Sequence, residues 1–446
     1  MKLNVFTRVW ILAAVLIPAS LSAQTPLQKY LEEAITNNLE LQNRDFAVQK
    51  SLYALKEAKG LFLPDVNFNT QYLASGGGRK IEIPIGDLLN PVYSTLNNLT
   101  SSGQFPQVEN VSQSFNPNNF YDAKVHTTLP LYNAEIIFNT KIKKEQINIR
   151  QAELNVYKRE LIKNVKLAYY GYLQSLSAIE VLNNGIVLAK ENLRINEAMV
   201  KNGKAIRTVV NRAENEVTGL KAQLEDARSQ ALNAAAYFNF LLNKPLNSAI
   251  GVEQVQAGLS ADTSGSRKSD ELLALESAGK ANLLALQLNK AAYLPKLSTF
   301  LDLGAQGDFL KVNDESPYYL FGVTLSWQIF AGNQRKNKIQ QASMDVKSAN
   351  NQVSQAEQRL QLEIETAANK LKAAIQVYDA SVSQASLSRQ YFKDQQRLYK
   401  EGQALYLELL DAQARLINDE LKQSITYLTA QTRAAELERA KSSYTF

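Results

Sequence analysis

The chain contains no cysteine among its 446 residues, and its only histidine is His126. The absence of cysteine excludes disulfides, a lipidated N-terminal cysteine, thiolate metal ligands and cysteine nucleophiles. One histidine is too few for a usual zinc site or a Ser-His-Asp triad, and we expect His126 to lie on the polar face of a strand. No phosphate-binding loop or metal-ligand cluster stands out. The sequence therefore predicts no catalytic residue, no metal site and no cofactor.

Long apolar runs and blocks of one charge are also scarce. The apolar run at residues 9–17 follows Lys2 and Arg8 and precedes small residues at 20–23, which is typical of a secretory signal peptide over residues 1–23. This run is too short to span a bilayer. Removing Lys2 and Arg8 lowers the formal net charge of +6 by two, to +4. The mature chain is mildly basic, and we expect no nucleic acid partner.

One stretch of the chain joins a strand pattern to a very long helix pattern. Apolar residues alternate there with small or polar ones, a period of two that predicts a strand with one apolar face. The apolar positions, which we expect to face lipid, are Val323, Leu325, Trp327 and Ile329. Gly332 ends the strand, and a helical pattern without proline continues to Gly402. A lipid-compatible strand that leads into such a helix indicates a membrane-anchored helical assembly.

The same device occurs earlier in the chain. Residues 125–131 alternate between apolar and polar side chains and lead into a helix predicted over residues 134–202. Apolar and small residues recur in this helix at seven-residue steps, which is typical of a coiled-coil seam. The two heptad positions are Leu161, Val165, Ala168, Tyr172, Ser175, Ile179, Leu182, Ile186, Ala189 and Leu193.

Proline and glycine divide the rest of the chain. Pro64 and Pro295 each stop a helix before a strand, because proline lacks the backbone N–H that a helix needs. We expect helices at residues 25–63, 205–242, 270–293 and from the turn at 400–402 to about 439, with strands at 66–72 and 297–303. Residues 75–118 are rich in Gly, Ser, Asn and Pro and predict a long exposed loop, in which residues 81–89 leave room for a local fold. Residues 305–318 predict a short loop.

The chain repeats itself once. Residues 293–295 echo residues 62–64, the strand-to-helix junction at 329–332 echoes the junction at 131–134, and the turn at 400–402 echoes the turn at 201–203. Three echoes in the same order indicate an internal duplication. The first repeat spans residues 24–246, a linker spans 247–269, and the second repeat spans 270–446.

Dimensions suggest the architecture. A helix over residues 134–202 is roughly 100 Å long, and strands of about ten residues cross an outer membrane when tilted. Four strands cannot close a barrel, and open edges in lipid leave costly unpaired backbone groups. Two copies give eight strands, whose interior side chains fill, whereas three copies give twelve and room for a lumen. The fold class is therefore a membrane β-barrel combined with a long α-helical barrel, closed as a trimer.

The order of these pieces resembles the TolC-like outer membrane efflux and secretion channels. The resemblance covers the whole mature chain and rests on the duplication, the helix-Pro-strand junctions at Pro64 and Pro295, and the strand-to-helix junctions LPLYNA and WQIFAG. The turn YKEGQALYLELLDAQARL, residues 399–416, is a further mark. The resemblance implies a homotrimer in the bacterial outer membrane with its helical barrel in the periplasm. It also implies a passive exit duct for efflux or type I secretion, coupled through a periplasmic adaptor to an inner-membrane pump of the RND, ABC or MFS type.

The resemblance also implies site residues. Glu408 and Asp411 share one helix face and match acidic residues that line the closed periplasmic aperture in the family, and Tyr399 matches a tyrosine that helps to latch it. The first repeat lacks these acids at residues 208–211, and the alternative is that both acids are ordinary solvated surface residues. The turns expected to form the periplasmic tip, where an adaptor docks, contain Asn202, Gly203, Lys204, Glu401, Gly402 and Gln403.

Two other classes of function remain open. A structural coiled-coil protein of the cell envelope, without channel activity, would explain the heptads but not four strands with alternating faces. An enzyme inside a β-barrel would need a convergent polar site, which the sequence does not show.

Overall fold

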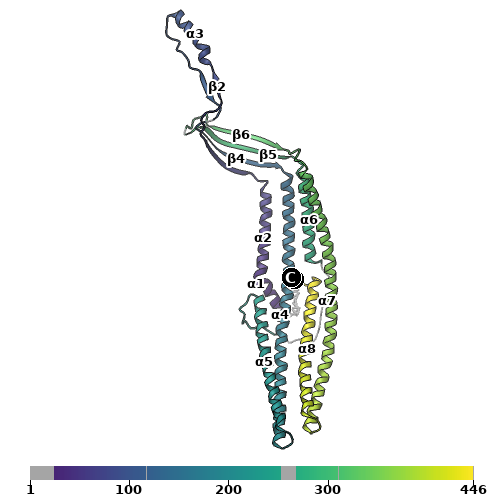
Figure 1. The fold of residues 1–446 in the computed structure, drawn as a ribbon. Coiled ribbons are helices and arrows are strands. Elements are labelled where there is room, and N and C mark those ends of the chain that lie inside the picture. Colours follow the sequence, from purple (N-terminus) through teal and green to yellow (C-terminus); the bar gives the residue numbers. More distant parts are fainter. Residues whose placement is uncertain (1–24, 117, 253–267, 310, 445–446) are drawn as a thin grey trace, which may run out of the picture. The chain divides into compact units, whose positions relative to one another are not determined.

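The computed structural model describes residues 25–116, 118–252, 268–309 and 311–444. The expected signal peptide lies outside the described residues, as does the segment 253–267 of the expected linker. The chain divides into two compact units (Figure 1). The sheet unit consists of Ala47–Gln151 and Ala274–Ser354, and the helical unit of Met1–Phe46, Ala152–Leu273 and Gln355–Phe446. Each unit therefore draws on both halves of the sequence.

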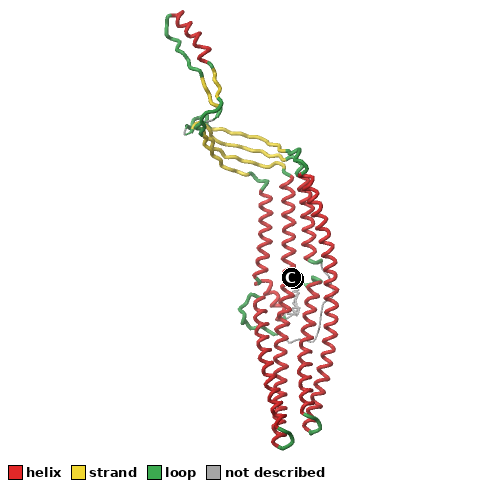
Figure 2. Tube along the Cα trace, viewed as in Figure 1, coloured by secondary structure: helices red, strands yellow, loops and turns green. Residues whose placement is uncertain are grey.

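The sheet unit contains one antiparallel sheet of four strands in the order β1-β4-β5-β6 (Figure 2). The strands are β1 (Asp65–Leu73), β4 (Phe120–Tyr132), β5 (Lys296–Asp308) and β6 (Pro317–Ser326). Because all pairs are antiparallel, the helices that precede β1 and β5 and those that follow β4 and β6 attach at one end of the sheet. These helices are α2 (Leu39–Gly60), α6 (Asp270–Ala291), α4 (Ala134–Lys201) and α7 (Gln334–Lys400). The four predicted strands and two very long helices are confirmed.

The second half of the sheet differs from the sequence prediction at its ends. β6 stops at Ser326, whose partner Lys296 begins β5. Pro295, the residue before Lys296, has no N–H with which to extend the ladder. Trp327 leaves the sheet and donates its indole N–H to the carbonyl oxygen of Tyr293 at 3.0 Å. Trp327 and Ile329 therefore lie beyond the strand in which we expected them. At the other end, β5 continues to Asp308 and shortens the loop expected at residues 305–318.

A glycine inside β6 makes room for an aromatic ring. Gly322 pairs with Phe300 of β5, and a Cβ on Gly322 would lie 2.6 Å from the Phe300 ring. Such a contact is far inside van der Waals range, so a side chain at this position would displace the ring. Covering a strand glycine with a neighbouring aromatic side chain is a known way to fix strand register.

The helix predicted over residues 25–63 is two helices, α1 (Pro26–Asn37) and α2. The break falls at Asn38, whose backbone is extended. Its side-chain oxygen accepts a hydrogen bond from the Leu41 N–H at 3.0 Å, which caps the second helix. Its amide group donates to the Leu241 carbonyl oxygen at 3.2 Å. An asparagine side chain that competes for backbone groups therefore ends one helix and begins the next.

The long loop predicted at residues 75–118 contains a folded insertion. β2 (Lys80–Ile83) pairs with β3 (Val111–Ser114), and α3 (Ile85–Thr100) lies between them in the sequence. Asparagine side chains hold α3 to the returning chain. Asn90 accepts from the Val108 N–H at 2.8 Å, and Asn97 accepts from the Phe105 N–H at 3.1 Å. Composition indicated only a local fold at residues 81–89 and not its extent, because amide side chains, rather than a large apolar core, tie the insertion together.

The helical unit contains α1, α5 (Arg207–Leu241), α8 (Tyr406–Ala440) and the remaining parts of α4 and α7. Six of the ten predicted seam residues of α4 are buried, namely Leu161, Val165, Ala168, Leu182, Ile186 and Ala189. The other four, Tyr172, Ser175, Ile179 and Leu193, are half-buried. One apolar cluster joins α4 to α5 and to Ile417 of α8, and a second joins α4, α5, α7 and α8. In the described part of the chain, no helix combines the length and hydropathy of a membrane span.

Candidate functional site

The pairing register gives the sheet two chemically different faces. Directly paired residues lie on one face, so that Phe68, Val125 and Leu303 form one apolar row, and Leu297 and Leu325 another. The remaining large apolar residues of this face are Val66, Tyr72, Leu129, Leu301, Tyr319, Phe321 and Val323. The opposite face is mainly polar, with Asn67, Asn69, Gln71, Lys124, His126, Thr128, Ser298, Asp302, Thr324 and Ser326.

His126 lies on this polar face, as expected. It hydrogen-bonds to Asp302, whose other carboxylate oxygen lies 3.0 Å from the Lys124 Nζ. The Asp302 side chain is only 5% exposed and has two partners, as a buried carboxylate requires. One layer further along the same face, Tyr318 donates to Asp122 at 2.8 Å. The Asp302 cluster and the Tyr318–Asp122 hydrogen bond give the polar face a hydrophilic centre.

The two turns expected at the tip have the same backbone geometry. Gly203 and Gly402 have φ angles of 68° and 75°, in the left-handed region that favours glycine. The N–H of Lys204 bonds to the Met199 carbonyl oxygen at 2.8 Å, and the N–H of Gln403 bonds to that of Leu398, also at 2.8 Å. Both are Schellman motifs. The motif ends the α4 and α7 helices and reverses the chain into α5 and α8.

The residues that follow these turns expose apolar side chains. Ile206 is 71% exposed and Leu405 is 70% exposed. They occupy the N-cap positions of α5 and α8, where their side chains offer no oxygen to the free N–H groups of the helix. Neither residue therefore acts as a side-chain cap of its helix.

Tyr399 lies inside the helical unit. It is 6% exposed, packs against Tyr406 with ring centroids 5.7 Å apart, and donates its hydroxyl to the side-chain oxygen of Asn196 on α4. Burial raises the pKa of Tyr399 above its usual range. Burial, together with the charge of Glu216, raises the pKa of Tyr406 to about 12. Both phenols are therefore neutral at physiological pH, and Tyr399 ties α7 to α4.

A second buried polar contact lies one turn away. Asn192 of α4 donates to the side-chain oxygen of Gln413 of α8 at 2.5 Å and accepts a hydrogen bond from Gln396 of α7 at 3.4 Å. Asn192 and Gln413 are each 1% exposed. Sequence reasoning missed Asn192 and Gln413. For Asn196, the partner of Tyr399, one signal was present, because the heptad series that includes Leu182 and Ala189 continues to Asn196. A polar residue at a seam position specifies how helices pair.

Glu408 and Asp411 are both exposed, on the side of α8 away from its buried residues Leu409 and Ala412. Glu408 accepts a hydrogen bond from the Leu405 N–H at 3.1 Å and thereby caps α8. Asp411 lies 2.9 Å from the guanidinium of Arg415. In the described chain, neither Glu408 nor Asp411 forms a hydrogen bond with Tyr399. The two acids share one exposed face, and Asp411 has a cation beside it.

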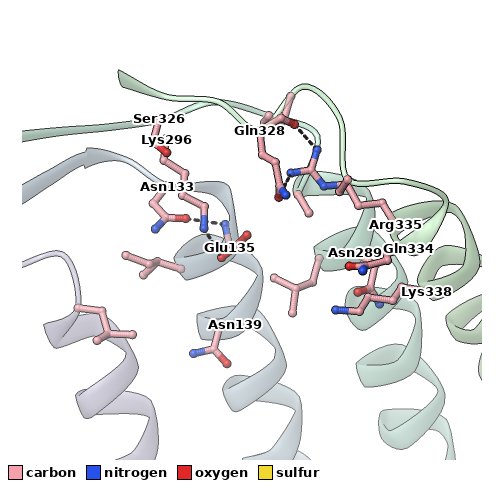
Figure 3. Close-up of a pocket in the computed structure, with 16 residues that line it drawn as sticks. Asn133, Glu135, Asn139, Asn289, Lys296, Ser326, Gln328, Gln334, Arg335 and Lys338 are labelled. Carbon is pink, nitrogen blue, oxygen red and sulfur yellow. Dashed lines mark hydrogen bonds and ion pairs between the residues drawn. The ribbon is translucent and has the colours of Figure 1, made fainter. Parts of the chain in front are cut away.

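A cavity of about 680 Å³ lies where the helices meet the sheet, within the sheet unit (Figure 3). Its wall includes the first residue of β5 (Lys296), its partner at the end of β6 (Ser326), and residues in the first turns of α4 and α7. Four charged residues line it: Glu135, Lys296, Arg335 and Lys338. Sequence reasoning did not single out these residues, because they are up to 203 positions apart and none belongs to a motif.

Solved structures share this fold. The outer-membrane channel OprN has 16% identity and a TM-score of 0.77, with 93% of this chain and 89% of that chain covered. VceC from Vibrio cholerae has 13% identity and a TM-score of 0.73, with coverages of 93% and 95%. The open state of the Neisseria gonorrhoeae MtrE channel has 17% identity and a TM-score of 0.73, with coverages of 93% and 88%. At these identities the likeness shows the fold alone.

The sequence comparison with family models gives the membership. A search of curated proteins finds no match. The model described as outer membrane efflux protein matches residues 30–244 and 267–440. With most of its length matched in this way, the chain belongs to the TolC-like outer membrane efflux protein family, whose members are non-enzymatic channels of the bacterial outer membrane with a helical extension in the periplasm.

Proposed function

We propose that three copies of this chain form the exit duct of a tripartite efflux or type I secretion system. The duct is passive and is coupled through a periplasmic adaptor to an inner-membrane pump of the RND, ABC or MFS type. The observation that carries the proposal is a four-stranded sheet with one apolar face, one polar face and two edge strands, β1 and β6, without a partner in the described chain. The two repeats, residues 24–246 and 270–446 with the linker 247–269 between them, supply one hairpin each.

The sheet edges support the trimer. Unpaired N–H and C=O groups cost several kcal/mol each in lipid, so β1 of one copy pairs with β6 of the next until the barrel closes. The apolar face then contacts lipid and the polar face lines a lumen. Twelve strands leave space inside the barrel that eight strands would fill.

Residues at the end of β6 support a defined position in the membrane. Val323 and Leu325 lie on the apolar face and are 58% and 64% exposed in a single chain. Trp327 and Ile329 follow the strand and are also exposed. Tryptophan prefers the membrane–water interface, so these two residues mark the periplasmic border of the bilayer.

The tip supports adaptor docking. The turns at Asn202-Gly203-Lys204 and Glu401-Gly402-Gln403 share one geometry, and each is followed two residues later by an exposed apolar residue. We propose that helices of an adaptor pack against Ile206 and Leu405 in the grooves between neighbouring hairpins. The exposed apolar surface would otherwise face water without compensation.

We infer that Glu408 and Asp411 line the periplasmic aperture. Glu408 and Asp411 lie about two turns from Gly402 on an exposed face of α8. In a trimer they would form rings of carboxylates near the axis, which favour cations. Arg415 beside Asp411 reduces the net charge of these rings. Tyr399 contributes by holding α7 against α4 rather than by contacting the acids.

Purified protein in detergent tests the assembly, and planar bilayers test the channel. We expect a monodisperse trimer by light scattering and stable single-channel currents. A folded monomer would contradict the trimer, and a trimer without conductance would favour a structural coiled-coil protein of the envelope.

Single cysteines test the docking end, since the chain has none of its own. Lys204→Cys and Gln403→Cys should crosslink to an adaptor. Gln113→Cys, in the folded insertion at the opposite end of the β1–β4 hairpin, is the matched control. Capture by the control alone would show that the assignment of the two ends is wrong.

A further inference from the structure

The cavity at the junction of sheet and helices has an unbalanced charge. Lys296 and Glu135 lie 2.7 Å apart and neutralise each other. Arg335 donates to the backbone oxygen of Gln328 at 2.5 Å and to its side-chain oxygen at 2.7 Å, and both acceptors are uncharged. Lys338 also lines the cavity (Figure 3). Among the described residues, neither Arg335 nor Lys338 has a carboxylate within ion-pair distance.

The start of α7 adds to this positive field. A helix N-terminus carries partial positive charge, and acidic residues usually occupy its first turn. α4 follows this rule with Glu135, but the first turn of α7 has no acidic residue and instead brings Arg335 to the cavity. The two repeats therefore differ at this position in the sign of the charge. At the start of α7, the positive charge of Arg335 therefore lies beside the partial positive charge of the helix N-terminus, and a bound anion would reduce this repulsion.

The strand register shows to which side the cavity opens. Ser326 and Lys296 line it and are a directly opposed pair. Every second residue of β5 lies on the same face, so Lys296 shares a face with Ser298, Phe300 and Asp302. The Lys296–Ser326 pair therefore belongs to the polar face of the sheet. In the trimer proposed above, on which this step rests, the polar face surrounds the lumen. Three copies then place six uncompensated cations around the base of the barrel.

Apolar and amide groups complete the wall. Leu61, Ile136, Leu288 and Leu294 line the cavity, as do Asn139 and Asn289. Aliphatic side chains would contact the body of a ligand, the amides would hydrogen-bond to it, and the guanidinium of Arg335 is suited to carboxylate, sulfonate or phosphate oxygens. A cavity of about 680 Å³ is in the usual range for a small-molecule site.

We propose that this cavity is a lumenal binding site for amphipathic organic anions. Arg335 and Lys338 hold the anionic group, and the aliphatic wall holds the apolar body. The site is a step on the way out of the channel, where weak and repeated binding raises the local concentration of anionic solutes without trapping them.

Fluorescence anisotropy of pyrene-1,3,6,8-tetrasulfonate with the purified trimer in a neutral detergent tests the site. We expect salt-sensitive binding to the wild type and an affinity lower by about tenfold or more in R335A/K338A. K336A is the matched control: it removes one cation from the same helical turn, but Lys336 does not line the cavity. K338A alone serves as a milder variant, and light scattering verifies that each variant remains a trimer. E135Q should tighten binding, since it removes the only carboxylate of the wall.

Three results would overturn the proposal: no binding to the wild type, unchanged binding in R335A/K338A, or an equal loss in K336A. Repeating the measurement in nanodiscs addresses lipid headgroups, which share this chemistry. Binding in phosphatidylcholine that disappears in phosphatidylglycerol would mean that the cavity opens to the bilayer, and the lumenal site would be wrong. Failure of the channel itself would appear separately, as a monomer or as the absence of conductance. A conducting trimer that does not bind the dye refutes only this inference.

Discussion

The hydrogen bond between Tyr399 and Asn196 gives the sharpest test of the tip, through Tyr399→Phe. The substitution keeps the ring and its contact with Tyr406 but removes the hydroxyl that donates a hydrogen bond to the Asn196 oxygen. Asn196 is fully buried, so water does not replace the lost donor. An unsatisfied buried acceptor costs about 1–3 kcal/mol, which changes a local opening equilibrium by a factor of about 5–150.

Hydrogen exchange of the intact trimer measures this opening. In Tyr399→Phe, we expect amides of α4 near Asn196 and the last turns of α7 to exchange faster by about that factor. The amides of the sheet unit should not change. If the tip is the closed aperture, single-channel recordings should also show more frequent or larger openings, because α7 is no longer held to α4.

Tyr391→Phe is the control, because Tyr391 lies on the same helix and is 38% exposed. It should change neither exchange nor conductance. Unchanged exchange at the tip of Tyr399→Phe would refute the reasoning, since it would mean that the buried hydrogen bond contributes nothing to holding α7 against α4.

Three further expectations follow from the faces, the acids and the buried phenols. Val323→Arg should lower the stability of the barrel by about 2–4 kcal/mol if the residue is near the bilayer midplane, and Thr324→Arg should lower it less; equal losses in thermal melting of the trimer would reject the assignment of faces. Changing both Glu408 and Asp411 to alanine should raise conductance and lower cation preference, as measured by reversal potentials in a salt gradient; an unchanged preference would remove both residues from the aperture. Folding raises the pKa of Tyr406 to about 12 and so stabilises its neutral form. The resulting contribution to the stability of the fold is complete below the ordinary pKa of the phenol and is lost as pH rises toward 12. The melting temperature of the wild type should therefore fall over this window, and that of Tyr406→Phe should fall less.

Local patterns in the sequence predicted most of the elements. A period of two predicted the strands, and seven-residue steps predicted the α4 seam, because side-chain direction in a strand or helix depends only on position along the element. Pro64, Pro295, Gly203 and Gly402 marked where elements end, because their effects on the backbone are also local. These signals were enough to predict four strands, two very long helices and a duplicated chain.

Side-chain hydrogen bonds and a proline explain where the predicted bounds of helices and strands were wrong. The first helix divides at Asn38 because one side chain caps the second helix, and β6 ends at Ser326 because its neighbour across the sheet is followed by Pro295. The insertion folds because Asn90 and Asn97 accept hydrogen bonds from Val108 and Phe105 in the segment that follows α3. Hydrophobic periodicity does not record hydrogen bonds of this kind.

Only the tertiary structure decided which residues meet. The pairing of β4 with β5 joins the two repeats into one sheet and aligns His126 with Asp302, 176 positions away. The same fold buries Asn196 against Tyr399 and brings Lys296 and Arg335 to one cavity. Of these residues, the sequence singled out only His126 and Tyr399, and it identified the partner of neither. Their roles depend on register and on contacts between distant segments, which the packing of the whole chain determines and no local pattern encodes.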